Sequence, residues 1–242
     1  MHTPSVALLL VLTFAAAGCI DQFIDGDRPD PYDYVSSSDY ERMVIEIDYV
    51  SGHEPPSQAL STLRQRVEAC LDKPAGIQIN VDDAIPPQGS PYSLDDIFRI
   101  RDTYRDVAHG DNNAASMWIV YLDGQYSGGA QTLGLATAGD TIAIFDDRVD
   151  DAANLLVSST TIHRAVLVHE VGHLLGLVNN GIPMQTNHED PEHRGHSDNR
   201  NSVMYWAVET SNIVTLVQNG GSIPLDFDAD DRADLRAAGG TC

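Results

Sequence analysis

The sequence predicts an α/β protein in which one mixed sheet of five strands is packed against helices. Strand-like and helix-like patterns alternate from residue 42 onward, in the order β-α-β-α-β-β-β-α, followed by a long loop and a last helix. Elements that alternate in this way must cover the faces of a sheet to bury their apolar sides. A hydrophobic content of 42% over 242 residues is enough for one domain with an ordinary core.

Each element has its own signal. The strands are β-branched or alternate apolar with polar residues, and we expect them at residues 43–50, 77–81, 117–122, 132–137 and 141–145. Helical periodicity and caps predict helices at residues 57–71, 93–108, 160–177 and 226–238. Pro74 and Gly76 end the first of these helices, and Ser93 with Asp96 forms an approximate capping box for the second.

The N-terminal region predicts export. Residues 1–19 contain a short apolar run that ends in small residues, as in a signal peptide. Ala16-Ala17-Gly18-Cys19 resembles a bacterial lipobox, in which the cysteine is lipidated. We therefore expect an extracytoplasmic lipoprotein held at a membrane of the cell envelope through Cys19, with ordinary secretion as the alternative. Residues 20–40 are rich in Asp, Pro and Ser and predict a flexible tether before a folded domain at 41–242.

The net charge and the cysteine content limit which binding partners and which cellular compartment we expect. The formal net charge is −22, with 36 acidic residues against 14 basic ones, and such a surface repels the phosphates of nucleic acids. The chain has three cysteines, so lipidation of Cys19 would leave Cys70 and Cys242 as a pair. In an oxidising compartment these two are predicted to form a disulfide. The alternative is a buried Cys70 and a free Cys242.

The strongest chemical signal is His169-Glu170-Val171-Gly172-His173. Two histidines four residues apart project from the same face of a helix, so both imidazoles can bind one tetrahedral zinc ion. Glu170 is then placed to act as a general base toward a zinc-bound water. An HExxH pattern also occurs by chance, so the rest of the chain has to support one catalytic zinc.

With Gly176 three residues further on and a later Met204, this pattern resembles the metzincin clan of zinc metallopeptidases. The element order matches the N-terminal half of that fold, and the resemblance covers most of residues 42–238. It implies a mostly parallel five-stranded sheet and a methionine turn beneath the zinc, here at Ser202-Val203-Met204-Tyr205. Tyr205 is expected to be a wall of the substrate pocket.

The third zinc ligand departs from the usual pattern of the clan. Its normal position is occupied by Asn179, and a neutral amide is a poor zinc ligand. The spacing from His196 to Met204 resembles archaemetzincin-like members, with Ser197 and Ser202 standing where those proteins have cysteines. The resemblance therefore implies that His196 is the third ligand, displaced by an insertion at about 179–195, and that a second, structural zinc is absent. The alternatives are His188, Asp190 and His193 or, for a gluzincin-like site, Glu189, Glu192 and Glu209.

The resemblance implies a zinc-dependent endopeptidase that hydrolyses peptide bonds in peptide or protein substrates, and we expect the protein to be a monomer. The strand near residues 133–136 resembles the rim strand of the clan, along which an extended substrate pairs. The alternative function is a non-catalytic, zinc-containing binding lipoprotein on the same scaffold. The presence of Glu170 argues against that alternative, because a binding scaffold does not need this carboxylate.

Overall fold

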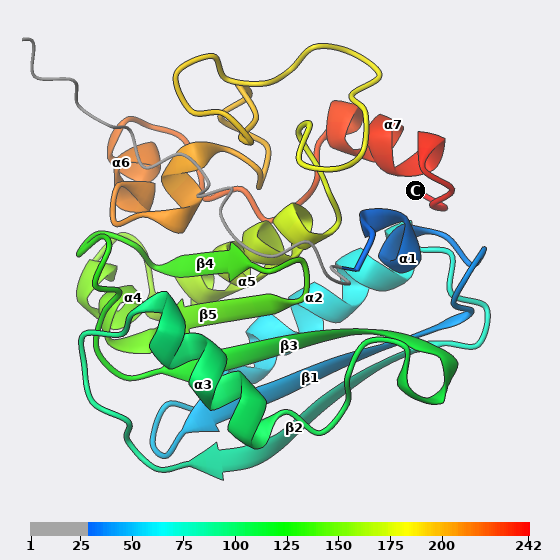
Figure 1. The fold of residues 1–242 in the computed structure, drawn as a ribbon. Coiled ribbons are helices and arrows are strands. Elements are labelled where there is room, and N and C mark those ends of the chain that lie inside the picture. The colour runs from blue at the N-terminus through cyan, green and yellow to red at the C-terminus, as the bar shows by residue number, and fades with distance from the viewer. Residues whose placement is uncertain (1–28) are drawn as a thin grey trace, which may run out of the picture.

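The computed structural model describes residues 29–242, so the predicted signal peptide, Cys19 and the first part of the predicted tether lie outside the described residues. One sheet of five strands has the order β2-β1-β3-β5-β4, in which only the edge strand β4 is antiparallel to its neighbour (Figure 1). The mixed, mostly parallel sheet is therefore confirmed. Its strands are β1 (Arg42–Val50), β2 (Ile77–Ile85), β3 (Ala114–Leu122), β4 (Gly134–Thr137) and β5 (Thr141–Phe145).

Helices cover both faces of the sheet, which explains why the central strand β3 is buried along its whole length. Alternate side chains of a strand point to opposite faces. Met117, Ile119 and Tyr121 belong to the core under α2 (Ser57–Cys70) and α5 (Ser159–Leu174). Trp118, Val120 and Leu122 belong to the core under α3 (Leu94–Tyr104), which crosses the other face (Figure 1).

The predicted tether is wrong for residues 29–40, which pack against the domain. This segment contains helix α1 (Pro31–Val35), whose Tyr34 and Val35 are fully buried. The ammonium group of Lys73, the only lysine of the chain, donates hydrogen bonds to the backbone carbonyls of Asp33, Ser36 and Tyr40. The segment is ordered because a distant side chain satisfies its backbone and because two of its own side chains complete the core.

Several helix boundaries differ from the prediction. The capping box at Ser93 is confirmed, but α3 ends at Tyr104, and α5 ends at Leu174 because Gly176 adopts a left-handed conformation, with φ +79°. α7 (Ala229–Ala237) begins after Asp228, whose side chain caps it. The short elements missed by periodicity are α4 (Asp146–Ala152), α6 (Ile213–Gln218), and the 3₁₀ turns η1 (Asp111–Asn113) and η2 (Trp206–Glu209). No helix within residues 29–242 has the length and apolar content needed to cross a bilayer.

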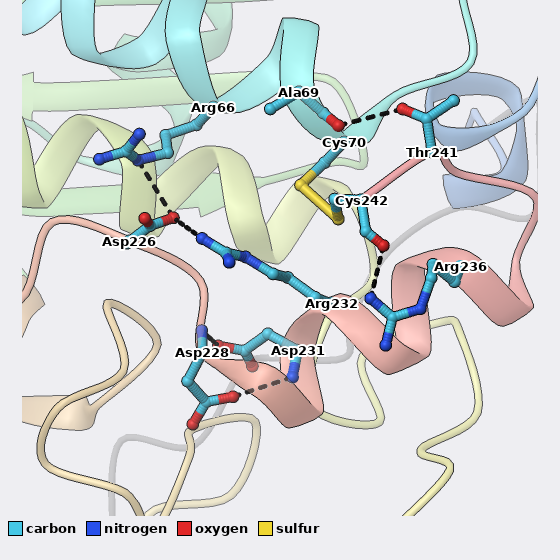
Figure 2. Close-up of a disulfide and its surroundings, with 10 residues drawn as sticks. All are labelled: Arg66, Ala69, Cys70, Asp226, Asp228, Asp231, Arg232, Arg236, Thr241 and Cys242. Carbon is cyan, nitrogen blue, oxygen red and sulfur yellow. Dashed lines mark hydrogen bonds and ion pairs between the residues drawn. A yellow bond between two sulfur atoms is a disulfide. The ribbon is translucent and has the colours of Figure 1, made fainter.

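The C-terminus is joined to α2 by a disulfide between Cys70 and Cys242, which are 172 residues apart in sequence (Figure 2). This is the pairing predicted from the cysteine count. Thr241 strengthens the attachment, because its backbone N–H donates to the carbonyl of Cys70 at 2.8 Å. Asp226 forms ion pairs with Arg66 of α2 at 3.2 Å and with Arg232 of α7 at 2.7 Å. The segment that carries α7 is therefore fixed to the helix layer beneath the sheet.

Candidate metal centre

Helix α5 places two of the predicted zinc ligands side by side. The Ser158 side chain caps the helix by accepting a hydrogen bond from the Thr161 N–H. From that start the helix runs into the core, where His169 and His173 are both buried. Their Nε2 atoms are 3.0 Å apart, as expected for residues one turn apart on the same face.

The long loop after α5 brings His196 to the same place. Its ring centroid lies 5.3 Å from that of His169 and 4.9 Å from that of His173, and the residue is buried. The neighbouring Ser197 N–H donates to the carbonyl of Met204 at 2.9 Å, which ties this part of the loop to the predicted methionine turn. The structure thus brings together the three histidines that were predicted as ligands.

The other loop residues considered as third ligands point elsewhere. The Nε2 atom of His188 lies 2.9 Å from a carboxylate oxygen of Asp234 on α7. His193 lies 2.9 Å from Asp190 and stacks on Trp206, with ring centroids 4.3 Å apart and an interplanar angle of 6°. These contacts stabilise the conformation of the loop. Of the loop histidines, His196 is the one that joins His169 and His173.

Met204 lies directly against helix α5 at Gly172, the fourth residue of the HExxH pattern. A Cβ atom on Gly172 would lie 2.3 Å from the Met204 sulfur, so the methionine can occupy this position only beside a glycine. Met204 is fully buried, and its turn closes through a hydrogen bond from the Tyr205 N–H to the Ser202 carbonyl at 3.2 Å. Tyr205 follows beside the Trp206 ring, with their centroids 5.7 Å apart.

The turn also determines which nitrogen of His169 is available. Nδ1 of His169 lies 2.7 Å from the Val203 carbonyl oxygen, so Nδ1–H donates and the lone pair is on Nε2. In metal sites, a hydrogen bond of this kind orients a ligating imidazole. Burial lowers the pKa of His169 and, together with the neighbouring histidines, the pKa of His173. Both rings are therefore neutral, the form that binds metal.

The donor set fits zinc. Both ring nitrogens of His196, and Nδ1 of His173, are buried without a hydrogen-bond partner among residues 29–242. Buried polar atoms normally have partners, so their lack of one is an observation that needs a cause. A cation shared by the Nε2 atoms of His169, His173 and His196 would account for the unpartnered Nε2 atom of His196, and imidazole nitrogen is a usual ligand of zinc.

Glu170 follows His169 on α5, and its carboxyl group lies against strand β4. Both of its carboxyl oxygens are buried and have no hydrogen-bond partner in the described part of the chain. A Cβ atom on Gly134 of β4 would lie 2.5 Å from Glu170 Oε1, so the close packing depends on a glycine there. Burial, with the charge of Glu209 adding to it, raises the pKa of Glu170 well above its usual value. A carboxyl group in such a position readily accepts a proton.

Glu209 is the one residue of the cluster whose role was not anticipated. The sequence suggested it only as a replacement for His196, whereas the structure places it together with all three histidines. Its carboxylate oxygens lie 3.4 Å from Nε2 of His196, 3.7 Å from Nε2 of His169 and 3.9 Å from Nε2 of His173. The only sequence signal was an acidic residue shortly after the methionine turn, at the end of what proves to be η2.

Comparisons with known proteins agree with this architecture. No family model and no curated protein matches the sequence. Among solved structures, metalloproteinase-II from Bacteroides fragilis is similar with a TM-score of 0.50 and 12% identity over 84% of this chain, which spans 54% of that protein. Archaemetzincin from Methanopyrus kandleri is similar with a TM-score of 0.50 and 15% identity, covering 82% of this chain and 96% of that one. The chain therefore has a metzincin-like fold, the fold of these metallopeptidases.

Proposed function

We propose that this protein is a zinc-dependent peptidase that hydrolyses internal bonds of peptide or protein substrates. One observation carries the proposal: His169, His173 and His196 converge at one place, and Glu170, the residue after His169 on α5, has a buried carboxyl group without a hydrogen-bond partner in the described part of the chain. Three neutral imidazoles leave the full charge of the metal in place, and a carboxyl group that is not held in an ion pair is free to transfer protons. The metzincin-like fold supports this reading, because the structures that share it include metallopeptidases.

A zinc ion held by the three histidines would act as a Lewis acid that polarises the scissile carbonyl and acidifies water. Glu170 supplies the proton transfers: its carboxylate takes a proton from the attacking water and delivers it to the leaving amine. The Val203 carbonyl keeps His169 in the tautomer that presents Nε2. Strand β4, at the edge of the sheet and in contact with Glu170 through Gly134, is the strand along which an extended peptide would pair.

The test is cleavage of an unbiased peptide mixture by the purified, zinc-loaded protein, with Glu170→Gln as the inactive comparison and Glu68→Gln as the control. Glu68 is on the exposed face of α2, so its substitution makes the same chemical change away from the site. We expect internal cuts by the wild type and by Glu68→Gln, and a loss of at least about a hundredfold in Glu170→Gln. Equal activity of all three proteins would contradict the proposal.

We also propose that the protein is exported and lipid-anchored through Cys19. The Cys70–Cys242 disulfide supports an oxidising compartment, because stable disulfides are rare where glutathione keeps thiols reduced. Expression of the full chain in a bacterial host with labelled palmitate is expected to label the wild type and not Cys19→Ser. Label in both proteins, or in neither, would be evidence against the anchor.

A further inference from the structure

We propose that Glu209 is a fourth protein ligand that closes the zinc site, so that the resting protein is latent until a substrate displaces this carboxylate. The ligand assignment rests on the positions of four side chains, and the latency rests on the peptidase function proposed above. The three histidines alone would leave one corner of a tetrahedral ion open. A carboxylate oxygen of Glu209 lies within 4.8 Å of a ring nitrogen of each of the three histidines.

The distances are close to those of a tetrahedral set. Ligands at about 2.0–2.1 Å from a tetrahedral ion lie about 3.3–3.4 Å from one another. The distances from the carboxylate oxygens of Glu209 to the three Nε2 atoms range from 3.4 to 3.9 Å, and the first two Nε2 atoms are 3.0 Å apart. Small shifts therefore suffice for all four groups to bind one ion.

The chemistry of a four-ligand site differs from that of an open one. Zinc sites with four protein ligands are structural, whereas catalytic sites keep a position for water or substrate. A carboxylate is a negatively charged ligand, so it also reduces the charge that the ion presents to a scissile carbonyl. Glu170, by contrast, packs against β4 and is left free of ligand contacts. The site thus contains the parts of a catalytic centre together with a group that blocks it.

Glu209 is also the member of the cluster that can leave. Its side chain is 30% exposed, whereas those of the three histidines are at most 10% exposed. Its backbone is fixed, because its carbonyl accepts a hydrogen bond from the Leu133 N–H at 2.8 Å and Thr210 forms a bridge with Thr132. Rotation of the side chain about its own bonds would open the fourth position without any change in the fold.

The same backbone bonds connect the blocking residue to the substrate strand. Leu133 and Thr132 immediately precede β4, the strand proposed to pair with an extended peptide. A peptide that adds to β4 therefore arrives next to the segment that carries Glu209. The substrate and the Glu209 carboxylate would compete for the same place, and a ligand shifts such an equilibrium only by its preference for the open state.

The first experiment measures access to the metal rather than catalysis. The protein is loaded with Co²⁺ and titrated with imidazole, a neutral ligand whose binding to an open position changes the visible absorption spectrum. Glu209→Gln removes the carboxylate at nearly constant shape, and Glu68→Gln is the matched control. We expect Glu209→Gln to bind imidazole at least about tenfold more tightly than the wild type and the control. Equal imidazole affinities in all three proteins would overturn the proposal.

Zinc affinity, measured by competition with a chelator, gives the second readout. Loss of a ligand is expected to weaken zinc binding by at least about tenfold in Glu209→Gln, and by less in Glu209→Asp, which keeps the charge on a shorter side chain. Unchanged affinity in both variants would also overturn the assignment. The Asp variant provides a test in case the Gln variant does not fold.

Peptide cleavage then separates the two proposals. If Glu209→Gln cleaves peptides faster than the wild type while binding zinc more weakly, both proposals are supported. If zinc and imidazole behave as expected but neither protein cleaves, Glu209 is a ligand and the peptidase function fails, and latency fails with it. If the wild type cleaves and the metal measurements do not change, the peptidase function stands and the role of Glu209 is wrong.

Discussion

Replacing Gly172 with alanine tests whether contact between α5 and Met204 shapes the metal centre. The added Cβ atom would lie 2.3 Å from the Met204 sulfur, 3.2 Å from its terminal methyl and 3.2 Å from the Phe227 ring. Met204 is fully buried and Phe227 nearly so, and neither can move into solvent. Forcing an extra methyl group into such a core costs about 1–3 kcal/mol.

Helix propensity acts in the opposite direction, which makes the prediction specific. Alanine stabilises the interior of a helix by about 1 kcal/mol relative to glycine. In the wild-type background we therefore expect Gly172→Ala to lower the free energy of unfolding by about 0–2 kcal/mol. In a Met204→Ala background the sulfur is gone, and the same substitution is expected to raise the free energy of unfolding by about 1 kcal/mol.

The assay is urea unfolding of the metal-free proteins with their disulfide intact, carried out on the wild type, both single variants and the double variant. A coupling energy of about 1–3 kcal/mol, with the sign of the Gly172→Ala effect reversed between backgrounds, is the expected result. Equal effects in the two backgrounds would refute the packing argument.

Zinc affinity should follow the same displacement. Movement of Met204 also moves Val203, whose carbonyl holds Nδ1 of His169 at 2.7 Å. Losing such a contact typically costs about 10–100-fold in metal affinity. An unchanged zinc affinity in Gly172→Ala would show that the turn tolerates the displacement.

Three further predictions concern the third ligand, an acidic residue of α7 and the disulfide. His196→Ala is expected to lose its zinc during gel filtration, as measured by metal analysis, whereas His193→Ala is expected to retain it. The reverse result would show that His193, and not His196, is the third ligand. Burial, with the charge of Asp228 adding to it, raises the pKa of Asp231 to about 6 in the folded protein. Ionisation of Asp231 therefore opposes folding, and the free energy of unfolding falls as the pH rises from about 4 to about 6. Asp231→Asn should therefore gain up to about 3 kcal/mol relative to the wild type over that range in urea unfolding, and parallel pH profiles would contradict this. Replacing Cys242 with serine should lower the free energy of unfolding by about 2–5 kcal/mol, because Cys70 then no longer closes the chain; no difference from the wild type would mean that the disulfide adds no stability.

The strands and the helix of the metal centre could be predicted because their signals are local. Residues 117–122 of β3 form an unbroken apolar run, and α5 carries two histidines at a spacing that places them on the same face only in a helix. His196 could be predicted from its distance in sequence from Met204. The structure explains this spacing by the hydrogen bond from the Ser197 N–H to the Met204 carbonyl.

The features that were missed depend on contacts between distant residues. Helix α1 looked like a tether because its order comes from Lys73 and from burial of Tyr34, neither of which affects its local composition. Glu209 lies far from the HExxH pattern in sequence, and its position is set by a hydrogen bond to Leu133. Local patterns contain no information about such pairings, so the sequence could suggest Glu209 only as a substitute ligand.

The loop that delivers His196 is held in place by α7 rather than by regular structure of its own. His188 contacts Asp234, the Gln185 N–H donates to the same carboxylate at 2.6 Å, and Ser202 donates to Asp231. α7 is in turn joined to α2 through Cys242, and α2 packs against α5, the helix that carries the other two histidines (Figure 2). His196 is thus connected to His169 and His173 by one continuous set of contacts. A loop without regular structure can hold a candidate metal ligand when its shape is imposed from outside, and here a helix, two carboxylates and a disulfide impose it.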